Sequence, residues 1–256
     1  MASFLHKKHC KRIKVVIMNY NELNFDAINR ERELSMSAAF PVLMRKVYVW
    51  MTLALVLTGV TAYGVATSPG IMTALFSNQI LFWGLVIAEF ALVIGISAAI
   101  NKLSLTTATL MFVLYSVING AVLSSIFVIY TMSSIASVFF ITAGTFAVMA
   151  LIGYTTKTDL TSMGKILFMA LIGIIIATVV NIFLKSSGLE MIVSYLGVLI
   201  FVGLTAYDSQ KIKNMLLMAP DAGEGAQKLA LLGALTLYLD FINLFIYLLR
   251  IFGRRE

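Results

Sequence analysis

Seven apolar stretches, each long enough to cross a lipid bilayer, recur between residues 42 and 252 with only short polar breaks between them. A membrane-spanning helix needs about 20 apolar residues to cross roughly 30 Å of hydrocarbon. We predict spans at about 42–66, 80–100, 105–130, 135–154, 166–184, 191–212 and 229–252. Their continuous apolar composition argues against a β-barrel, whose strands alternate between apolar and polar residues. The pattern predicts an all-α integral membrane protein with seven transmembrane helices.

The amino-acid composition agrees with this fold class. Hydrophobic residues make up 60% of the 256 residues and charged residues only 12%, whereas a soluble domain typically carries about 25% charged residues. We therefore divide the chain into a polar, cytoplasmic N-terminal tail (1–40) and a seven-helix membrane domain (41–253). Charged residues at helical spacing predict a short surface helix in the tail before Pro41. Residues 1–17 are expected to be a flexible extension, with Met18 as a second candidate start of translation.

The lysines and arginines predict the orientation of the spans. With the N-terminus in the cytoplasm, fifteen of the nineteen face the cytoplasm and four face the other side, which is the bias expected of membrane proteins. This bias accounts for the net charge of +7, and we expect no nucleic-acid partner. Three of the four outer basic residues lie at the C-terminus (Arg250, Arg254 and Arg255), so a re-entrant last span stays open as an alternative.

Three ionisable residues, Glu89, Asp208 and Asp240, lie well inside apolar spans. Each costs about 2.5–3.5 kcal/mol at a helix centre on the membrane-insertion scale, so such residues face the bundle interior or a water-filled cavity and indicate functional sites. Glu89 has no basic residue within one turn and is either a neutral, protonated residue or a working ligand. Asp208 either pairs with Lys211, three residues on, or is solvated at the cytoplasmic end of its span.

The last span carries a polar stripe around Asp240. Thr236, Asp240, Asn243 and Tyr247 follow one another at spacings of four, three and four residues, so they share one helix face. The opposite face consists of Leu, Ile and Phe. This pattern indicates a helix that lines a cavity or the core of the bundle, unless the stripe only hydrogen-bonds to neighbouring helices.

Small residues in the third span indicate where two helices touch. Ser116, Gly120 and Ser124 repeat every four residues. This spacing lets two helix backbones approach closely, and we interpret it as packing.

An aspartate on each of the last two spans fits two mechanisms. In the first, the carboxylates meet across a cavity and share a proton, which Ca²⁺, a cation that prefers six to eight oxygen ligands, can replace. In the second, the pair activates water for intramembrane proteolysis. Tyr207-Asp208 is similar to the first motif of such proteases, but the second reads Tyr238-Leu-Asp240 instead of Gly-x-Gly-Asp, and the Pro-Ala-Leu element is missing. Other catalytic and phosphate-binding motifs are missing too, so we expect no enzyme and no cofactor.

The longest distinctive segment is Leu235-Thr-Leu-Tyr-Leu-Asp-Phe-Ile-Asn-Leu-Phe-Ile-Tyr-Leu-Leu-Arg250. It is joined by Gly203-Leu-Thr-Ala-Tyr-Asp-Ser-Gln-Lys-Ile212, Ala88-Glu89 and Tyr115-Ser-Val-Ile-Asn-Gly120. With these segments the chain resembles a bacterial member of the Bax inhibitor-1/YccA family over about residues 41–253. A motif of this length in the last span is specific.

The resemblance implies a seven-helix bundle in which the last helix is central and surrounded by the other six. It implies that some members conduct Ca²⁺ in a pH-dependent leak gated by an aspartate pair, which maps to Asp208 and Asp240. Glu89 matches an acidic residue of the family's second helix. Other members modulate cell-death pathways or, in bacteria, a membrane-bound quality-control protease.

The chain departs from the family pattern at one position. Members often carry an arginine at the end of the second helix that latches onto the aspartate of the sixth helix, and here that stretch has Ala99 and Ile100. Lys102 and Lys211 are the candidate replacements. Lysine lacks the bidentate fork of arginine, so we expect a weaker latch.

Two functions follow as hypotheses. The first is a pH-sensitive, Ca²⁺-permeable leak channel of a bacterial inner membrane, in which Asp208 and Asp240 form the gate and metal-ion site and Asn243 and Glu89 support it. The second is a non-transporting regulator that binds and modulates a membrane-bound quality-control protease through residues 1–40.

Overall fold

The computed structural model describes residue 30 and residues 38–219 and 223–255, so the predictions for residues 1–17 and for the tail helix lie outside it, apart from Arg30. Within the described part, seven helices are long and apolar enough to cross a membrane. In chain order the helices are Ala38–Ala66, α2 (Pro69–Ser77), α3 (Gln79–Ala99), α4 (Leu105–Leu123), α5 (Ile126–Ile129), α6 (Met132–Thr155), α7 (Thr161–Leu184), α8 (Ser187–Leu217) and α9 (Glu224–Phe252). The chain is therefore an all-α, multi-pass membrane protein.

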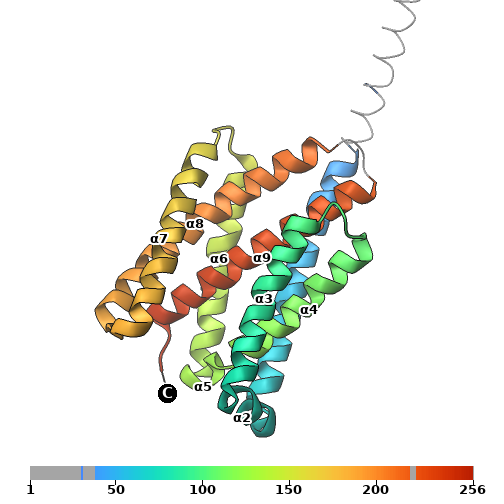
Figure 1. Ribbon diagram of the computed structural model, residues 1–256. Coiled ribbons are helices and arrows are strands. Elements are labelled where there is room, and N and C mark those ends of the chain that lie inside the picture. Colours follow the sequence, from blue (N-terminus) through green and yellow to red (C-terminus); the bar gives the residue numbers. More distant parts are fainter. Residues whose placement is uncertain (1–29, 31–37, 220–222, 256) are drawn as a thin grey trace, which may run out of the picture.

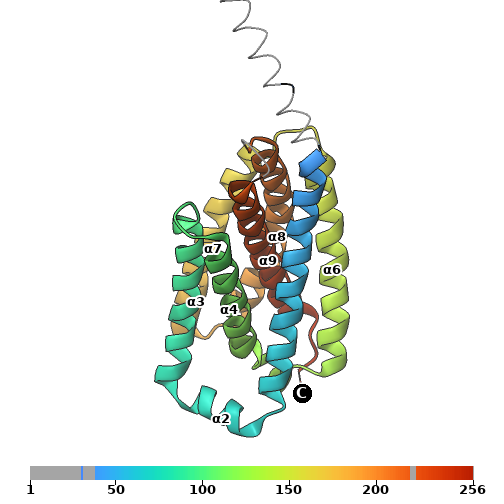
Figure 2. The ribbon, with the colours of Figure 1, turned by 90° about the vertical axis from the view of Figure 1, so that its right-hand side faces the viewer.

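Helix α9 lies at the centre of the bundle, with the other spans around it (Figures 1 and 2). Of its most apolar stretch 67% is buried inside the protein, compared with 44% for α8 and 6% for α3 and α7. It packs against α8, α6 and α4. The expectation of a central last helix is confirmed.

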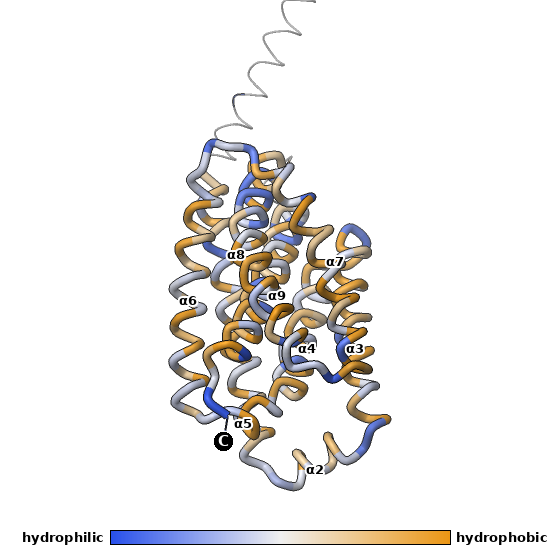
Figure 3. Tube along the Cα trace, turned by 90° about the vertical axis from the view of Figure 1, so that its left-hand side faces the viewer, coloured by the Kyte–Doolittle hydropathy of each residue, from blue (hydrophilic) through white to orange (hydrophobic). Residues whose placement is uncertain are grey.

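The outer helices present apolar side chains away from the bundle, and Figure 3 shows hydrophobic residues along α3, α6 and α7. Ile87 and Phe90 of α3 are each 66% exposed, and Phe183 of α7 is 81% exposed. Large apolar surfaces of this kind are rare on soluble monomers. They are the surfaces that a surrounding bilayer covers.

The third span is interrupted, unlike the continuous helix over 105–130 that the sequence predicts. Helix α4 stops at Leu123, and α5 follows after a break at Ser124 and Ser125. The Ser124 hydroxyl donates a hydrogen bond to the carbonyl of Ala121 at 2.6 Å. Such local side-chain bonds compete with helical backbone pairing, which explains the break.

Helices α8 and α9 begin earlier than predicted, and α8 also ends later. The predicted spans were 191–212 and 229–252, whereas the helices cover Ser187–Leu217 and Glu224–Phe252. Hydropathy detects the apolar part of a helix, and both helices continue into polar residues beyond it.

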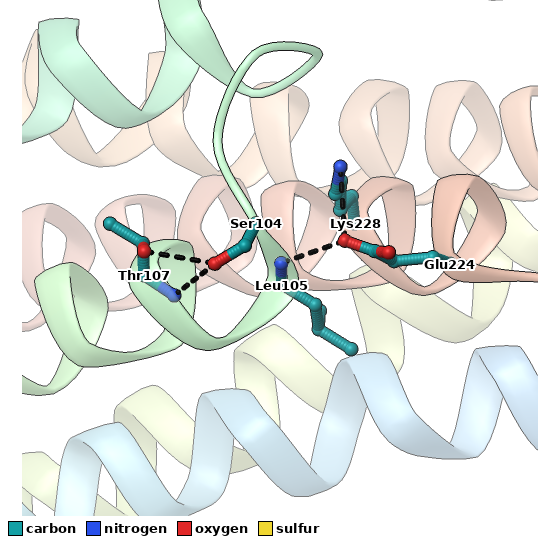
Figure 4. A network of polar contacts seen from close by, with 5 residues as sticks. All are labelled: Ser104, Leu105, Thr107, Glu224 and Lys228. Carbon is teal, nitrogen blue, oxygen red and sulfur yellow. Dashed lines mark hydrogen bonds and ion pairs between the residues drawn. The ribbon is translucent and has the colours of Figure 1, made fainter.

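Glu224 joins the beginnings of α9 and α4 (Figure 4). Its Oε1 accepts a hydrogen bond from the backbone N–H of Leu105 at 3.0 Å and lies 3.2 Å from Nζ of Lys228. In the same turn, Ser104 Oγ accepts a hydrogen bond from the N–H of Thr107 at 3.1 Å. Both contacts satisfy N–H groups that the first turn of a helix leaves without partners. The first turn of α9 is thereby anchored to the turn before α4.

The C-terminal residues lie at the opposite end of the bundle, near α5 (Figure 1). The N–H of Thr131 donates to the carbonyl of Arg254 at 3.1 Å, and the N–H of Arg254 donates to Ser134 Oγ at 2.9 Å. The Arg255 guanidinium lies 3.8 Å from the carboxylate of Glu190 at the start of α8. Helix α9 therefore runs unbroken from one end of the bundle to the other, and it is not re-entrant.

Helix α4 meets the helix Ala38–Ala66 at the small residues of the third span. A Cβ atom added at Gly120 would lie 2.5 Å from the carbonyl oxygen of Thr58. Ser116 and Ser124 are both fully buried, and the Thr58 hydroxyl donates to the carbonyl of Ser116 at 3.0 Å. The interpretation of this repeat as close packing is confirmed for Gly120 and Ser116.

Candidate functional site

A cavity of about 1010 Å³ lies beside α9, between α7 and α8, and also reaches α3. Its polar lining consists of Lys165 from α7, Tyr207, Asp208 and Lys211 from α8, and Thr236, Asp240, Asn243 and Tyr247 from α9. Phe90 is the residue of α3 that reaches it. The four residues of the predicted polar stripe thus line one cavity.

Asp208 and Asp240 meet at this cavity. Asp208 is 8% exposed and Asp240 is 4% exposed, and their carboxyl groups are close enough to interact. Two neighbouring ionised carboxylates repel each other, so a proton shared between them would stabilise the pair. Oδ2 of Asp240 is buried and finds no hydrogen-bond donor among the described residues. Asp208 is therefore a buried member of a carboxyl pair and not a solvated helix end.

Two lysines flank the pair, and they come from different helices. Nζ of Lys211 lies 4.0 Å from Oδ1 of Asp208 and 5.8 Å from the ring centroid of Tyr207. Lys165 enters the cavity from the first turns of α7. Lys102 is exposed in the turn before α4 and forms no ion pair with the residues that the structure describes. Lys211 is thus the candidate latch that the structure brings to Asp208.

Two uncharged members of the stripe, Thr236 and Asn243, form hydrogen bonds within α9. Thr236 Oγ1 donates to the carbonyl of Leu232 at 3.0 Å, and Asn243 Nδ2 donates to the carbonyl of Leu239 at 2.8 Å. Both contacts are with the helix itself and not with its neighbours. The oxygen atoms of both side chains keep lone pairs that can face the cavity.

The residues next to Asp208 hold α8 in position. Ser209 Oγ donates to the carbonyl of Ala150 in α6 at 2.9 Å. Gln210 donates to the carbonyl of Thr158 and accepts from the N–H of Leu160, both at 2.8 Å. These contacts bind α8 to α6 and to the connection between α6 and α7. They limit the rotation of α8 that would turn Asp208 away from α9.

Glu89 belongs to a second polar cluster, apart from the residues that line the cavity. Its hydrogen-bond partner is Asn119 of α4, and Asn119 Oδ1 accepts a hydrogen bond from the hydroxyl of Tyr238 at 3.1 Å. The Tyr238 hydroxyl also lies 2.6 Å from Oγ1 of Thr58. Oε1 of Glu89 is buried and has no partner among the described residues. The predicted site is thus divided, because Asp208, Asp240, Asn243 and Lys211 come together and Glu89 lies elsewhere.

Sequence reasoning missed most of this second cluster. Asn119 and Tyr238 are part of the family-like segments, but their side chains were given no role. A polar amide inside an apolar span is the signal that points to Asn119. The position of Thr58 carries no such signal, because threonine is common in membrane helices and often bonds to its own backbone.

The cavity can accept a cation but cannot enclose one with protein ligands alone. No group of three or more His, Cys, Asp or Glu residues within the described part of the chain could hold a metal ion. The carboxyl groups of Asp208 and Asp240, with the oxygen atoms of Asn243 and Thr236, provide at most six oxygen ligands, the lower limit of the six to eight that Ca²⁺ prefers. Water would have to supply any further ligands.

Known proteins are similar in sequence to this chain over most of its length. The family model described as "Inhibitor of apoptosis-promoting Bax1" matches residues 41–256. The chain is 54% identical over 221 residues to the inner membrane protein YbhL of Escherichia coli K12, which is 86% of this chain and 94% of that relative. It is 50% identical over 213 residues to an uncharacterized protein of Borreliella burgdorferi, with 83% of this chain and 92% of the relative covered. A further uncharacterized protein, from Rickettsia prowazekii, is 44% identical over 215 residues.

Proposed function

Because the chain belongs to the Bax inhibitor-1 family of membrane proteins, we propose that it is a pH-sensitive, Ca²⁺-permeable leak channel gated by Asp208 and Asp240. The observation that carries this proposal is the buried carboxyl pair, which lines a cavity of about 1010 Å³ among membrane-spanning helices. We assign the protein to the bacterial inner membrane, where the name of its Escherichia coli relative places that protein, with the N-terminus in the cytoplasm.

The gate works by exchange of a proton for Ca²⁺. With one proton between them, the two carboxyl groups form a hydrogen bond and carry a single negative charge. This hydrogen bond keeps α8 and α9 together. When the proton leaves, the second charge attracts Ca²⁺ and repels the neighbouring carboxylate. Lys211 opposes this step, because its ammonium group lies 4.0 Å from Asp208 and offers a competing positive charge.

The pH response follows from the groups around the pair. Lys211 and Tyr207 face the cavity from α8, Lys165 faces it from α7 and Tyr247 from α9, while α3 contributes the apolar Phe90. The carboxyl pair is the only acidic group among these lining residues. We therefore expect Ca²⁺ flux to rise with pH, because Ca²⁺ and the shared proton compete for the same oxygen atoms.

The test is Ca²⁺ flux into liposomes that contain the purified protein, measured from pH 6 to pH 8. Wild type should conduct with a clear pH response, and Asp208→Asn and Asp240→Asn should each lose that response. Asp159→Asn is the matched control, because Asp159 is an exposed carboxylate that lies before α7, outside the cavity. Two hydrogen bonds from Thr161 hold the pKa of Asp159 below its ordinary value. Wild-type flux no greater than that of empty liposomes would contradict the channel.

The alternative function, a regulator of a membrane-bound protease, depends on residues 1–40. Of these, the structure describes only residues 30 and 38–40, and no observation on them favours this role. Deletion of residues 1–37 separates the two functions. A channel keeps its flux after this deletion, whereas a regulator that docks through the tail loses its partner.

A further inference from the structure

A second large hollow lies on the other side of the bundle, between the helix Ala38–Ala66 and α6, which run side by side in Figure 2. Its volume is about 660 Å³, and its inner wall reaches Phe241 of α9. On α6 it is lined by Ala143, Ala147 and Ala150, at spacings of four and three residues. These small side chains leave room between the two helices. We call this hollow the α6 groove.

The α6 groove is long enough to hold one lipid acyl chain. It is lined on the first helix from Pro41 to Leu55. These residues are fourteen positions apart, or about 21 Å along the axis at 1.5 Å per residue. Half of the roughly 30 Å of hydrocarbon in a bilayer is about 15 Å. The groove can therefore take an acyl chain of one leaflet over its whole depth.

A single cationic side chain, that of Arg45, lines the groove, in the part nearer the start of the first helix. Arg45 is exposed and has no ion pair or hydrogen-bond partner among the described residues. The neighbouring cations are engaged, since Lys46 donates to Gln227 at 3.0 Å and Lys213 donates to the carbonyl of Tyr154 at 2.7 Å. A guanidinium group can bind a phosphate through two parallel hydrogen bonds. The groove thus combines an apolar channel with a free phosphate-binding group at its mouth.

We propose that the α6 groove binds one anionic phospholipid of the surrounding leaflet, with an acyl chain along the three alanines and the phosphate at Arg45. The net negative charge of the lipid matches the unpaired cation, which a zwitterionic headgroup complements less well because its own cation competes. This site is separate from the carboxyl pair and does not depend on the proposed channel function. It does place the lipid against Phe241, the residue after Asp240, so the bound lipid also supports α9.

The test is native mass spectrometry of the full-length, delipidated protein in detergent, titrated with dioleoylphosphatidylglycerol or with dioleoylphosphatidylcholine. Wild type should retain one phosphatidylglycerol in preference to phosphatidylcholine. Arg45→Gln should bind phosphatidylglycerol about tenfold more weakly, since charge-assisted hydrogen bonds are lost. Ala147→Trp should fill the groove and abolish retention of either lipid.

Two control variants separate the groove from its surroundings. Lys102→Gln removes another exposed charge from the same end of the bundle, and Val148→Trp adds a ring at a side chain of α6 that is 57% exposed. Both should bind like wild type, and circular dichroism with thermal unfolding should show that all four variants fold. Equal retention of the two lipids by wild type, or unchanged retention by Ala147→Trp, would overturn the proposal. The proposal would also be overturned if another occupant filled the groove in place of lipid. A second copy of the protein would be seen as a dimer that forms through the groove, and residues 1–37 would be seen as a cross-link to the Ala147→Cys variant.

Discussion

The hydroxyl groups of Thr58 and Tyr238 lie 2.6 Å apart, and this contact joins the helix Ala38–Ala66 to α9 across 180 positions of the chain. Tyr238 also lies 3.1 Å from Asn119 Oδ1, and Thr58 lies 3.0 Å from the carbonyl of Ser116. These three contacts depend on only two hydroxyl protons, so a change in one hydroxyl group also affects the hydrogen bonds of the other. Tyr238 is fully buried, and the rings of Phe112 and Tyr115 pack edge-on against it.

Replacement of Tyr238 by phenylalanine should destabilise the protein by about 1–2 kcal/mol. The ring stays in place, but Asn119 loses its donor and Thr58 loses a partner, and both residues are buried. Thermal unfolding in detergent measures the effect. Tyr195→Phe is the control, because Tyr195 is 54% exposed, and equal unfolding temperatures for the two variants would contradict the structural role of the hydroxyl.

Gly120→Ala should destabilise the bundle by about 1–3 kcal/mol, as expected of an overpacked contact. The added methyl group would lie 2.5 Å from the Thr58 carbonyl oxygen and 2.8 Å from Cβ of Thr61, so α4 has to move away from its neighbour. Gly144→Ala is the matched change in α6, where an added Cβ meets no atom within 4 Å. It should be neutral or stabilise by up to about 1 kcal/mol, since alanine favours helix more than glycine does. Unfolding curves that rank the two variants in the opposite order would show that this contact is not tight.

Removal of the positive charges that line the cavity should raise Ca²⁺ flux. Lys165 and Lys211 both line it, and like charges in a narrow cavity lower the local concentration of cations. We expect Lys165→Gln and Lys211→Gln to increase flux in liposomes by a factor of about two to ten, most strongly at low ionic strength. Lys211→Gln should change the free energy of unfolding by less than about 1 kcal/mol, because the ion pair is long, at 4.0 Å, and its lysine is exposed. Lys102→Gln lies outside the cavity and should leave flux unchanged, and a similar rise in that variant would contradict a local effect.

The two ends of the bundle should react with membrane-impermeant thiol reagents from opposite sides. In a Cys10→Ser background, we expect Lys102→Cys and Lys157→Cys to be labelled only after the cells are permeabilised, because the basic residues predict a cytoplasmic position. Ser77→Cys and Ser187→Cys lie at the other end and should be labelled in intact cells. The reverse pattern would invert the orientation, and labelling of all four from one side would contradict seven crossings.

The spans and the polar stripe of α9 could be predicted because both depend on local periodicity. Apolar length identifies a span, and the helical repeat places Asp240 and Asn243 on one face. Neither property says which helix that face meets. The pairing of Asn119 with Glu89, which removes Glu89 from the cavity, depends on how α3 and α4 are turned towards α9. The break at Ser124 was also not predicted, since a serine hydroxyl bonds to its own backbone in continuous helices as well.

The central position of α9 also determines the order in which the protein can be assembled. The helix that the others surround is the last to leave the ribosome, so the six earlier spans enter the membrane before their shared partner exists. Until then Asn119, Asp208 and Thr58 face a space that α9 later fills. Loss of α9 therefore removes the centre of the bundle and not one of its edges. Without α9, the polar groups that face it are left open to lipid.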